Sequence, residues 1–118
     1  MMVGFDFPVF SRMVSRLYPS LRCRYSLKEV LSVFRYFFTE YEQHTGHPHP
    51  PISRAHAKKL IEAMPETADG VALDPDEYYD LIDAYFDTDF PDCDYRIGHF
   101  FSGEIRDHRY QEVMDAQI

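Results

Sequence analysis

The sequence predicts an all-α protein, a compact bundle of about five to six short helices. Apolar residues recur at intervals of three and four along several stretches, which places them on one face of a helix. Helix-start signals precede these stretches, and prolines or glycines lie between them. At 118 residues, of which 45% are hydrophobic, the chain has room for one core. We expect a basic segment with a short helix at residues 1–25 and a helical domain at residues 26–118.

From Phe7 to Lys28, the chain has basic residues and no acidic ones. Pro8 suits the first turn of a helix, because that position leaves the amide hydrogen unused. The helix is expected to reach about Tyr18, where Pro19 ends it. The basic residues of this segment are Arg12, Arg16, Arg22, Arg24 and Lys28.

A core helix is predicted to begin after Ser26 and to run to about Gln43. Ser26 and Glu29 form a capping box, in which each side chain accepts a hydrogen bond from the other residue's backbone amide. The spacing of the apolar residues gives the helix a wide buried face. This face consists of Leu27, Val30, Leu31, Phe34, Phe37, Phe38 and Tyr41.

Two loops flank the next predicted helix. Three prolines and Gly46 make residues 44–51 a loop. Ser53 then caps a helix that runs to about Met64, before Pro65. Residues 66–73 form a polar loop around the turn dipeptide Asp69-Gly70.

The C-terminal third is predicted to hold three helices. Asp74, Pro75 and Glu77 are a cap, a first-turn proline and a capping-box partner for a helix that reaches about Asp87. A loop broken by Pro91 follows, then a short helix at residues 95–101 and a last helix at residues 104–114.

The protein is acidic, and its charge is unevenly distributed. The net charge is −8, which disfavours nucleic acid as a partner because nucleic acid is itself a polyanion. Between Leu60 and Tyr95 there are twelve acidic residues and no basic one. This distribution suits a basic partner or a solvated face.

One predicted helix carries a row of carboxylates. At 100° per residue, Asp76, Asp80, Asp83 and Asp87 fall on one side of the helix, opposite its apolar residues. We therefore predict a non-enzymatic protein that docks a basic protein surface through residues 76–94. It would act as a nucleic-acid mimic that inhibits its partner, or as an accessory factor. The predicted contacts also include Asp89 and Asp92. Two other interpretations stay open: a solvated face, and a face turned toward the N-terminal arginines.

Metal sites are weakly indicated. The aspartates of residues 87–94 suggest calcium, but an EF-hand loop fails there at Pro91, Asp92 and Gly98. Histidines suggest zinc, but a proline-stiffened loop explains their segment, and no cysteine lies near them in sequence. These histidines are His44, His47 and His49, with His56 as a fourth. We predict no bound metal or cofactor.

Catalysis is also weakly indicated. The nucleotide-binding, serine-hydrolase and metalloprotease motifs are absent. Either Cys23 or Cys93 would form a dyad with one of six histidines, but such pairs arise by chance. Asp92 and Asp94 flank Cys93 and disfavour its thiolate. A small metal-binding or thiol enzyme therefore remains an alternative.

A DNA-binding regulator is the other alternative. Residues 95–114 read as a helix-turn-helix whose second helix presents Arg106 and Arg109 to DNA. The N-terminal arginines Arg12, Arg16, Arg22 and Arg24 are further candidate contacts. Four acids on the second helix oppose such a role, and they are Glu104, Asp107, Glu112 and Asp115.

Cellular setting follows from what the sequence lacks. The first residues show no signal-peptide pattern, and no apolar run approaches the roughly 18 residues of a membrane span. Two cysteines far apart in sequence indicate reduced thiols rather than a disulfide framework. We expect a cytoplasmic protein that does not contact the membrane.

Two stretches resemble segments of short proteins without assigned activity that bacterial conjugative and integrative elements carry. They are SLKEVLSVFRYFFTEYEQHTGHPHPP and AYFDTDFPDCDYRIGHFFSGEIRDHRY, and the resemblance covers residues 26–112. It implies a bacterial cytoplasm and a mobile-element setting, in which small acidic proteins block host nucleases or defence complexes. It assigns no site residues, and it excludes the N-terminal segment.

Overall fold

The computed structural model describes residues 5–90, 93–101 and 105–116. These residues form six α-helices, as the sequence predicts, and a single isolated β-bridge between Glu66 and Ala72. The helices are α1 Phe7–Leu17, α2 Leu27–Thr45, α3 Arg54–Ala63, α4 Glu77–Asp87, α5 Ile97–Phe101 and α6 Ile105–Ala116, with a 3₁₀ turn at Tyr18–Ser20. In the described part of the chain, no helix has the length and hydrophobicity to cross a membrane.

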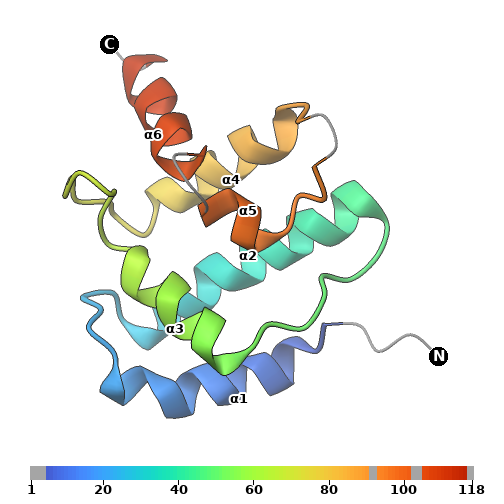
Figure 1. The fold of residues 1–118 in the computed structure, drawn as a ribbon, viewed down its shortest axis with the longest axis vertical. Helices are drawn as coiled ribbons and strands as arrows, with labels where there is room; N and C mark the ends of the chain where they lie inside the picture. Colours follow the sequence, from blue (N-terminus) through green and yellow to red (C-terminus); the bar gives the residue numbers. More distant parts are fainter. Residues whose placement is uncertain (1–4, 91–92, 102–104, 117–118) are drawn as a thin grey trace.

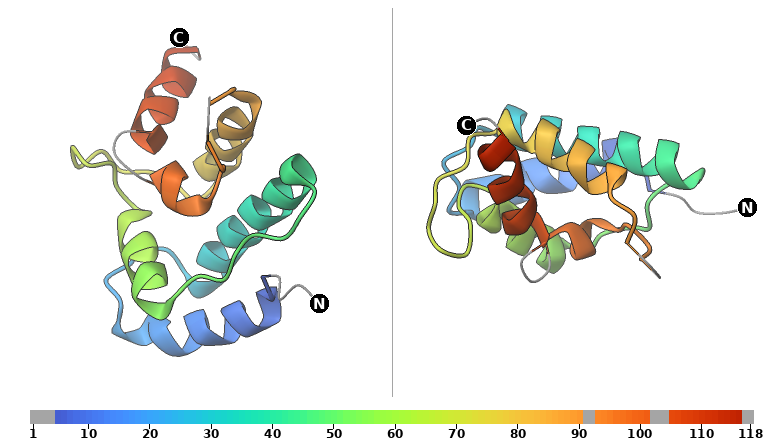
Figure 2. Two further views of the ribbon diagram at one scale, coloured as in Figure 1. Left: turned by 45° about the vertical axis from the view of Figure 1, so that its right-hand side comes forward. Right: turned by 90° about the horizontal axis from the view of Figure 1, so that it is seen from above.

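Helix α2 lies at the centre of the bundle. Figure 1 places α1 and α3 on one side of α2, and α4 and α6 on the other. The packed pairs are α2 with α4, α4 with α6, α1 with α3, α5 with α6 and α1 with α2. The left view of Figure 2 shows the same order, and the right view, from above, shows α4 lying along α2. The two halves of the chain are thus held together mainly through α2.

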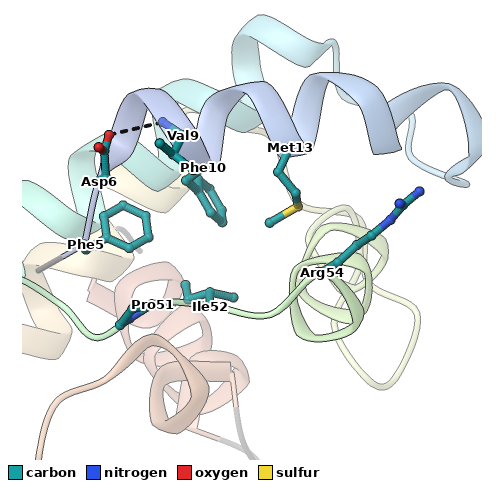
Figure 3. Close-up of a pocket in the computed structure, with 8 residues that line it drawn as sticks. All are labelled: Phe5, Asp6, Val9, Phe10, Met13, Pro51, Ile52 and Arg54. Atoms are coloured by element: carbon teal, nitrogen blue, oxygen red, sulfur yellow. Dashed lines mark hydrogen bonds between the residues drawn. The ribbon is translucent and has the colours of Figure 1, made fainter. Parts of the chain in front are cut away.

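The helix starts follow the local chemistry of their caps. In α2 the capping box is complete: the Glu29 amide donates to Ser26 Oγ at 3.1 Å, and the Ser26 amide donates to Glu29 Oε1 at 2.8 Å. Ser53 caps α3 by accepting from the His56 amide. Asp6, which the sequence analysis did not single out, caps α1 by accepting from the Val9 amide (Figure 3).

Two predicted helix starts are displaced by two residues. Helix α4 begins at Glu77, because the Glu77 amide donates to the Asp74 carbonyl and forms a tight three-residue turn. The Glu77 carboxylate still reaches back to the Asp74 amide, at 3.4 Å, as a capping box requires. Helix α5 begins at Ile97 rather than Tyr95, since Tyr95 adopts a left-handed φ of 59°.

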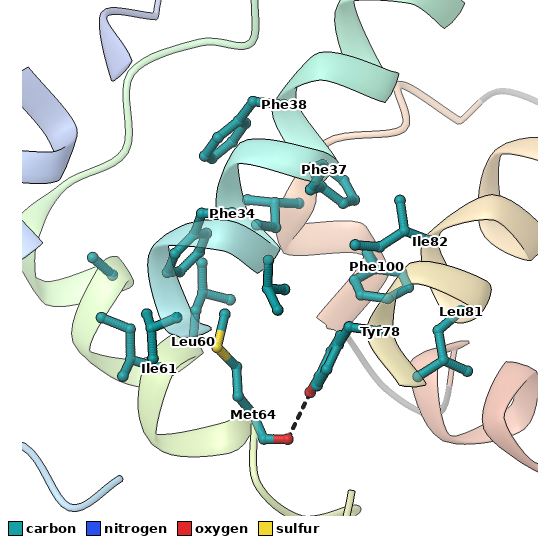
Figure 4. Packing of buried hydrophobic residues seen from close by; sticks show 14 of the residues in the cluster. Phe34, Phe37, Phe38, Leu60, Ile61, Met64, Tyr78, Leu81, Ile82 and Phe100 are labelled. Atoms are coloured by element: carbon teal, nitrogen blue, oxygen red, sulfur yellow. Dashed lines mark hydrogen bonds between the residues drawn. The ribbon is translucent and has the colours of Figure 1, made fainter. Parts of the chain in front are cut away.

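The core is built from aromatic rings. Phe34, Phe37, Tyr78 and Phe100 are all at most 1% exposed, and the rings of Phe37 and Phe100 lie 5.5 Å apart. Figure 4 shows α2, α3, α4 and α5 contributing side chains to this cluster. The Tyr78 hydroxyl donates to the Met64 carbonyl at 2.7 Å, so a buried phenol is satisfied without solvent.

Arg106 of α6 joins α6 to the end of α3. Its side chain is buried, with 7% exposed. The guanidinium donates to the Ala63 carbonyl at 2.5 Å, to the Glu66 carbonyl at 3.0 Å and to the Tyr78 hydroxyl at 3.2 Å. Asp107 neutralises it at 2.9 Å. A buried charge is tolerated here because every donor faces an acceptor.

A second set of donors binds the same turn from the N-terminal side. The Tyr25 hydroxyl donates to the Leu73 carbonyl at 2.7 Å and contacts the Met64 carbonyl at 3.2 Å. The Arg24 guanidinium donates to the carbonyls of Pro65 and Leu73, at 2.9 and 2.5 Å. We call the carbonyls of residues 63–66 and 73, together with these donors and Arg106, the carbonyl cluster.

Replacing Arg106 with methionine tests the carbonyl cluster. Arg106→Met keeps the length of the side chain but leaves several buried carbonyls without donors, so the free energy of unfolding should fall by about 2–4 kcal/mol. Urea denaturation measures this change. The control is Arg12→Met, at an exposed position of α1, which should stay within about 0.5 kcal/mol of wild type. Equal stability of the two variants would refute the role of Arg106.

Candidate functional site

Helix α4 presents two faces of opposite character. Its inner residues are all buried, and they are Tyr78, Leu81, Ile82, Tyr85 and Phe86. The four aspartates on its other side are exposed, as their helical spacing predicts, and they are Asp76, Asp80, Asp83 and Asp87. We call these four residues the acidic face. Because α4 packs on α2 and α6 through its apolar residues, the carboxylates point away from the core.

Among the described residues, no cationic side chain contacts the acidic face. Within the described residues, no Lys, Arg or His nitrogen lies within 4.0 Å of its carboxylates. Arg12 and Arg16 belong to α1, which lies on the opposite side of α2 from α4 (Figure 1). Arg12 and Arg16 therefore do not face the acidic face, so this part of the N-terminal segment does not neutralise it.

A groove between α2 and α4 adjoins the acidic face. It has a volume of about 320 Å³ and is lined by Ser32, Arg35, Tyr36, Thr39, Glu40 and Tyr79. The rings of Tyr36 and Tyr79 meet edge to face at 5.0 Å. The Tyr36 hydroxyl donates to the Asp83 carboxylate, and this bond raises the pKa of Tyr36 above its ordinary value. We call this feature the tyrosine groove, and it links aromatic rings to the carboxylates of α4.

The remaining predicted contacts lie beyond the end of α4. Asp89 is exposed, whereas Asp92 falls outside the described residues. Asp94 forms an ion pair with Arg96 at 3.2 Å and accepts from the Arg96 amide. In the described part of the chain, no group of three or more His, Cys, Asp or Glu side chains is placed to hold a metal ion.

The histidines of the proline-rich loop are not arranged as zinc ligands. His49 is buried, and both of its ring nitrogens are engaged: Nδ1 donates to the Pro50 carbonyl at 2.7 Å, and Nε2 accepts from the Ile97 amide at 3.0 Å. The ring of His44 instead packs on Tyr95, with 4.5 Å between centroids. His49 is thus a structural residue that fixes the start of α5.

The candidate nucleic-acid contacts are scattered. Arg106 is buried and its guanidinium binds the carbonyl cluster, so it is not placed to meet a phosphate or a base. Arg24 is exposed and binds two carbonyls of the cluster through Nη2. The other three N-terminal candidates are exposed, and they are Arg12, Arg16 and Arg22. The side chain of Arg109 and the predicted turn at 102–104 lie outside what the structure describes.

The structure selects one thiol–imidazole pair. Cys93 Sγ lies 3.2 Å from His99 Nδ1, and the Tyr85 hydroxyl lies 2.8 Å from the same nitrogen. We call Tyr85, Cys93 and His99 the thiol cluster. In contrast, burial raises the pKa of the Cys23 thiol. The spacing of Cys93 and His99 on a loop and a short helix does not predict their contact, because a loop has no fixed periodicity.

A further groove is apolar and separate from α4. It lies between α1 and residues 51–54, has a volume of about 460 Å³, and includes Val9, Phe10 and Met13 on its wall (Figure 3). Its charged residues are Asp6 and Arg54 only. This groove therefore adds nothing to the acidic face.

Comparisons with protein-family models, curated proteins and solved structures returned no match to this chain. Function must therefore be argued from the residues themselves.

The buried His49 predicts a pH dependence of stability. Burial lowers the pKa of His49 from 6.5 to about 4 in the folded protein. Above pH 6.5 neither state binds the proton, so this group adds no pH dependence. As the pH falls from 6.5 to 4, only the unfolded state takes up the proton, and the free energy of unfolding should fall by about 1.4 kcal/mol per pH unit.

Thermal or urea denaturation between pH 7 and pH 4.5 measures this effect. His49→Gln, which keeps an acceptor for the Ile97 amide, should be less stable at pH 7 but should show a shallower loss toward acid. His47→Gln is the matched control, because His47 is exposed, and it should retain the slope of wild type. Parallel curves for wild type and His49→Gln would contradict the assignment.

Proposed function

We propose that this is a non-enzymatic interaction protein that docks a basic protein surface through the acidic face of α4. The observation that carries the proposal is the row of four exposed carboxylates without a cationic neighbour among the described residues. A group of exposed charges of one sign attracts an oppositely charged partner over a distance, which raises the association rate. The net charge of −8 acts in the same direction.

The acidic face has a cost for the isolated protein. Asp76 with Asp80, and Asp83 with Asp87, are like charges four residues apart, and each pair destabilises a helix by about 0.2–0.5 kcal/mol. Asp87 lies in the last turn of α4, where the helix dipole also disfavours a negative charge. A basic partner would remove both penalties, so binding and stability are coupled at this face.

The tyrosine groove supplies the second part of the interface. Its rings offer a surface on which an arginine or lysine of the partner can pack, and Glu40 on the groove wall and Asp83, bonded to Tyr36, add negative charge. The groove also includes Arg35, whose guanidinium lies over the Phe7 ring at 5.5 Å. Aromatic anchors beside charged residues are typical of binding hot spots. Docking would then combine salt-dependent attraction by α4 with a packed contact at Tyr36 and Tyr79.

The class of partner follows from the same charge pattern. A linear row of negative charges resembles the phosphate row of a nucleic acid, so a nucleic-acid-binding protein fits it best. The proposal therefore includes inhibition by mimicry, or an accessory role beside such a protein. The proposal takes from the sequence resemblance to proteins of bacterial mobile elements the expectation that the partner is a bacterial cytoplasmic protein.

A charge-matched pair of variants tests the proposal. In the first, Asp76, Asp80, Asp83 and Asp87 are all replaced by Asn. In the second, four other exposed acids are replaced by their amides: Glu42, Glu66, Asp69 and Asp115. Both variants change the net charge equally. Wild type and the second variant should retain basic nucleic-acid-binding proteins from a bacterial extract at low salt, and duplex DNA should displace these proteins; the first variant should lose them.

Equal retention by both variants would show that total charge, rather than α4, governs binding, and would reject the proposal. A gel-shift assay with a short DNA duplex at low salt separates the alternative. The proposal expects no shift, whereas a shift that disappears in an Arg12→Ala, Arg16→Ala variant would support a DNA-binding regulator instead.

A further inference from the structure

The thiol cluster lies apart from the acidic face and has the layout of an activated nucleophile. Cys93 lies in the loop before α5, and His99 lies within α5. Their Sγ and Nδ1 atoms are 3.2 Å apart, and Sγ to Nε2 is 4.0 Å, so the nearer nitrogen faces the sulfur. A thiol within hydrogen-bond reach of an imidazole is the basic pair of an activated cysteine, and here the Tyr85 hydroxyl shares the same ring nitrogen at 2.8 Å.

Several donors converge on the sulfur. The backbone amide of Tyr95 donates to Cys93 Sγ at 3.2 Å, and the Tyr85 hydroxyl lies 3.8 Å from it. Burial, followed by the contact with Cys93, raises the pKa of Tyr85, so this phenol keeps its proton and remains a donor. Together with a protonated His99, these groups would stabilise a negative sulfur.

The backbone beside the sulfur is strained. Tyr95 has a φ of 59°, in the left-handed region that a residue with a bulky side chain rarely adopts. This residue supplies the amide that points at Sγ, and its hydroxyl donates to the Thr88 carbonyl at 2.7 Å. The fold thus maintains an unfavourable conformation at the place where the thiol receives its donor.

The charged groups around the thiol cluster balance one another. Asp94 is the nearest described carboxylate in sequence, and Arg96 pairs with it at 3.2 Å. His49 is held neutral by burial, which lowers its pKa to about 4. The ring of His56, in α3, also lies beside α5. It fits there because Gly98 has no side chain: a Cβ on residue 98 would lie 3.3 Å from the His56 ring.

His99 also lines a cavity of about 330 Å³. Its walls come from residues 49–52, His56 of α3, and the start of α5. The same wall includes Asp94 and Arg96, which pair with each other, and the buried ring of His49. The cavity therefore gives His99 contact with solvent rather than a cationic surface.

We propose that Cys93 is a reactive thiol, activated by His99, that exchanges with low-molecular-weight disulfides and so becomes reversibly capped. The thiol proton passes to His99 Nδ1. The sulfur attacks one sulfur of the disulfide, a new S–S bond forms, and the old S–S bond breaks. The released thiolate takes the proton from His99. The disulfide is the only oxidant, and the step is independent of the acidic face.

Cys23 provides an internal control, because burial raises the pKa of its thiol. Wild-type protein is incubated with oxidised glutathione at pH 7, and the modified cysteine is identified by peptide mass. Iodoacetamide, which reports thiolate directly, is used in parallel from pH 5 to pH 9. Cys93 should react at least about tenfold faster than Cys23 with both reagents.

His99→Gln should slow the reaction of Cys93 about tenfold and move its pH profile toward alkaline pH, while Cys23 stays unchanged. His99→Asn, with a shorter amide, serves the same purpose if the first variant does not fold. Equal reactivity of the two cysteines in wild type would overturn the proposal. A rate that is unchanged in a folded His99 variant would overturn the role of His99.

Discussion

The fold depends on the hydrogen bonds that side chains make to the backbone carbonyls of the segment between α3 and α4. Helix α3 ends at residue 63, and the chain then turns toward α4, where the carbonyls of residues 63–66 and 73 accept part-buried and buried hydrogen bonds from side chains elsewhere in the protein. Unsatisfied carbonyls would cost about 1–3 kcal/mol each. Arg106 reaches them from α6, and Arg24 and Tyr25 reach them from the chain ahead of α2. Side chains from the N-terminal and C-terminal parts of the chain therefore meet at this segment, where the Tyr78 hydroxyl at the start of α4 also binds.

The carbonyl cluster also determines the surface charge. Arg24 and Arg106 donate hydrogen bonds to backbone carbonyls. Arg12 and Arg16 belong to α1, which lies on the opposite side of α2 from α4. The carboxylates of α4 consequently meet solvent without a compensating cation in the described residues. The arginines of the carbonyl cluster therefore contribute to the fold, and the carboxylates of α4 remain exposed.

Local signals in the sequence predict the helices well, but they do not predict contacts between residues far apart in the chain. The capping box at Ser26 and the four-residue spacing of aspartates act within a few residues, so they predict α2 and the acidic face. Arg106 reads as an exposed DNA contact, but its partners lie about 40 residues away and only folding brings them near. The contacts of His49, and the contact between Cys93 and His99, are not predicted either. Loops have no periodicity from which to infer which side chains meet.

A titration of isotope-labelled protein with an arginine-rich peptide, followed by nuclear magnetic resonance, tests the docking face most directly. We expect the largest amide shifts at residues 76–87 and around Tyr36 and Tyr79, and we expect salt to abolish them. Shifts of equal size at Asp69, Asp115 and the other exposed acids would mean that the peptide senses total charge only. That result would contradict the assignment of α4 as the docking face.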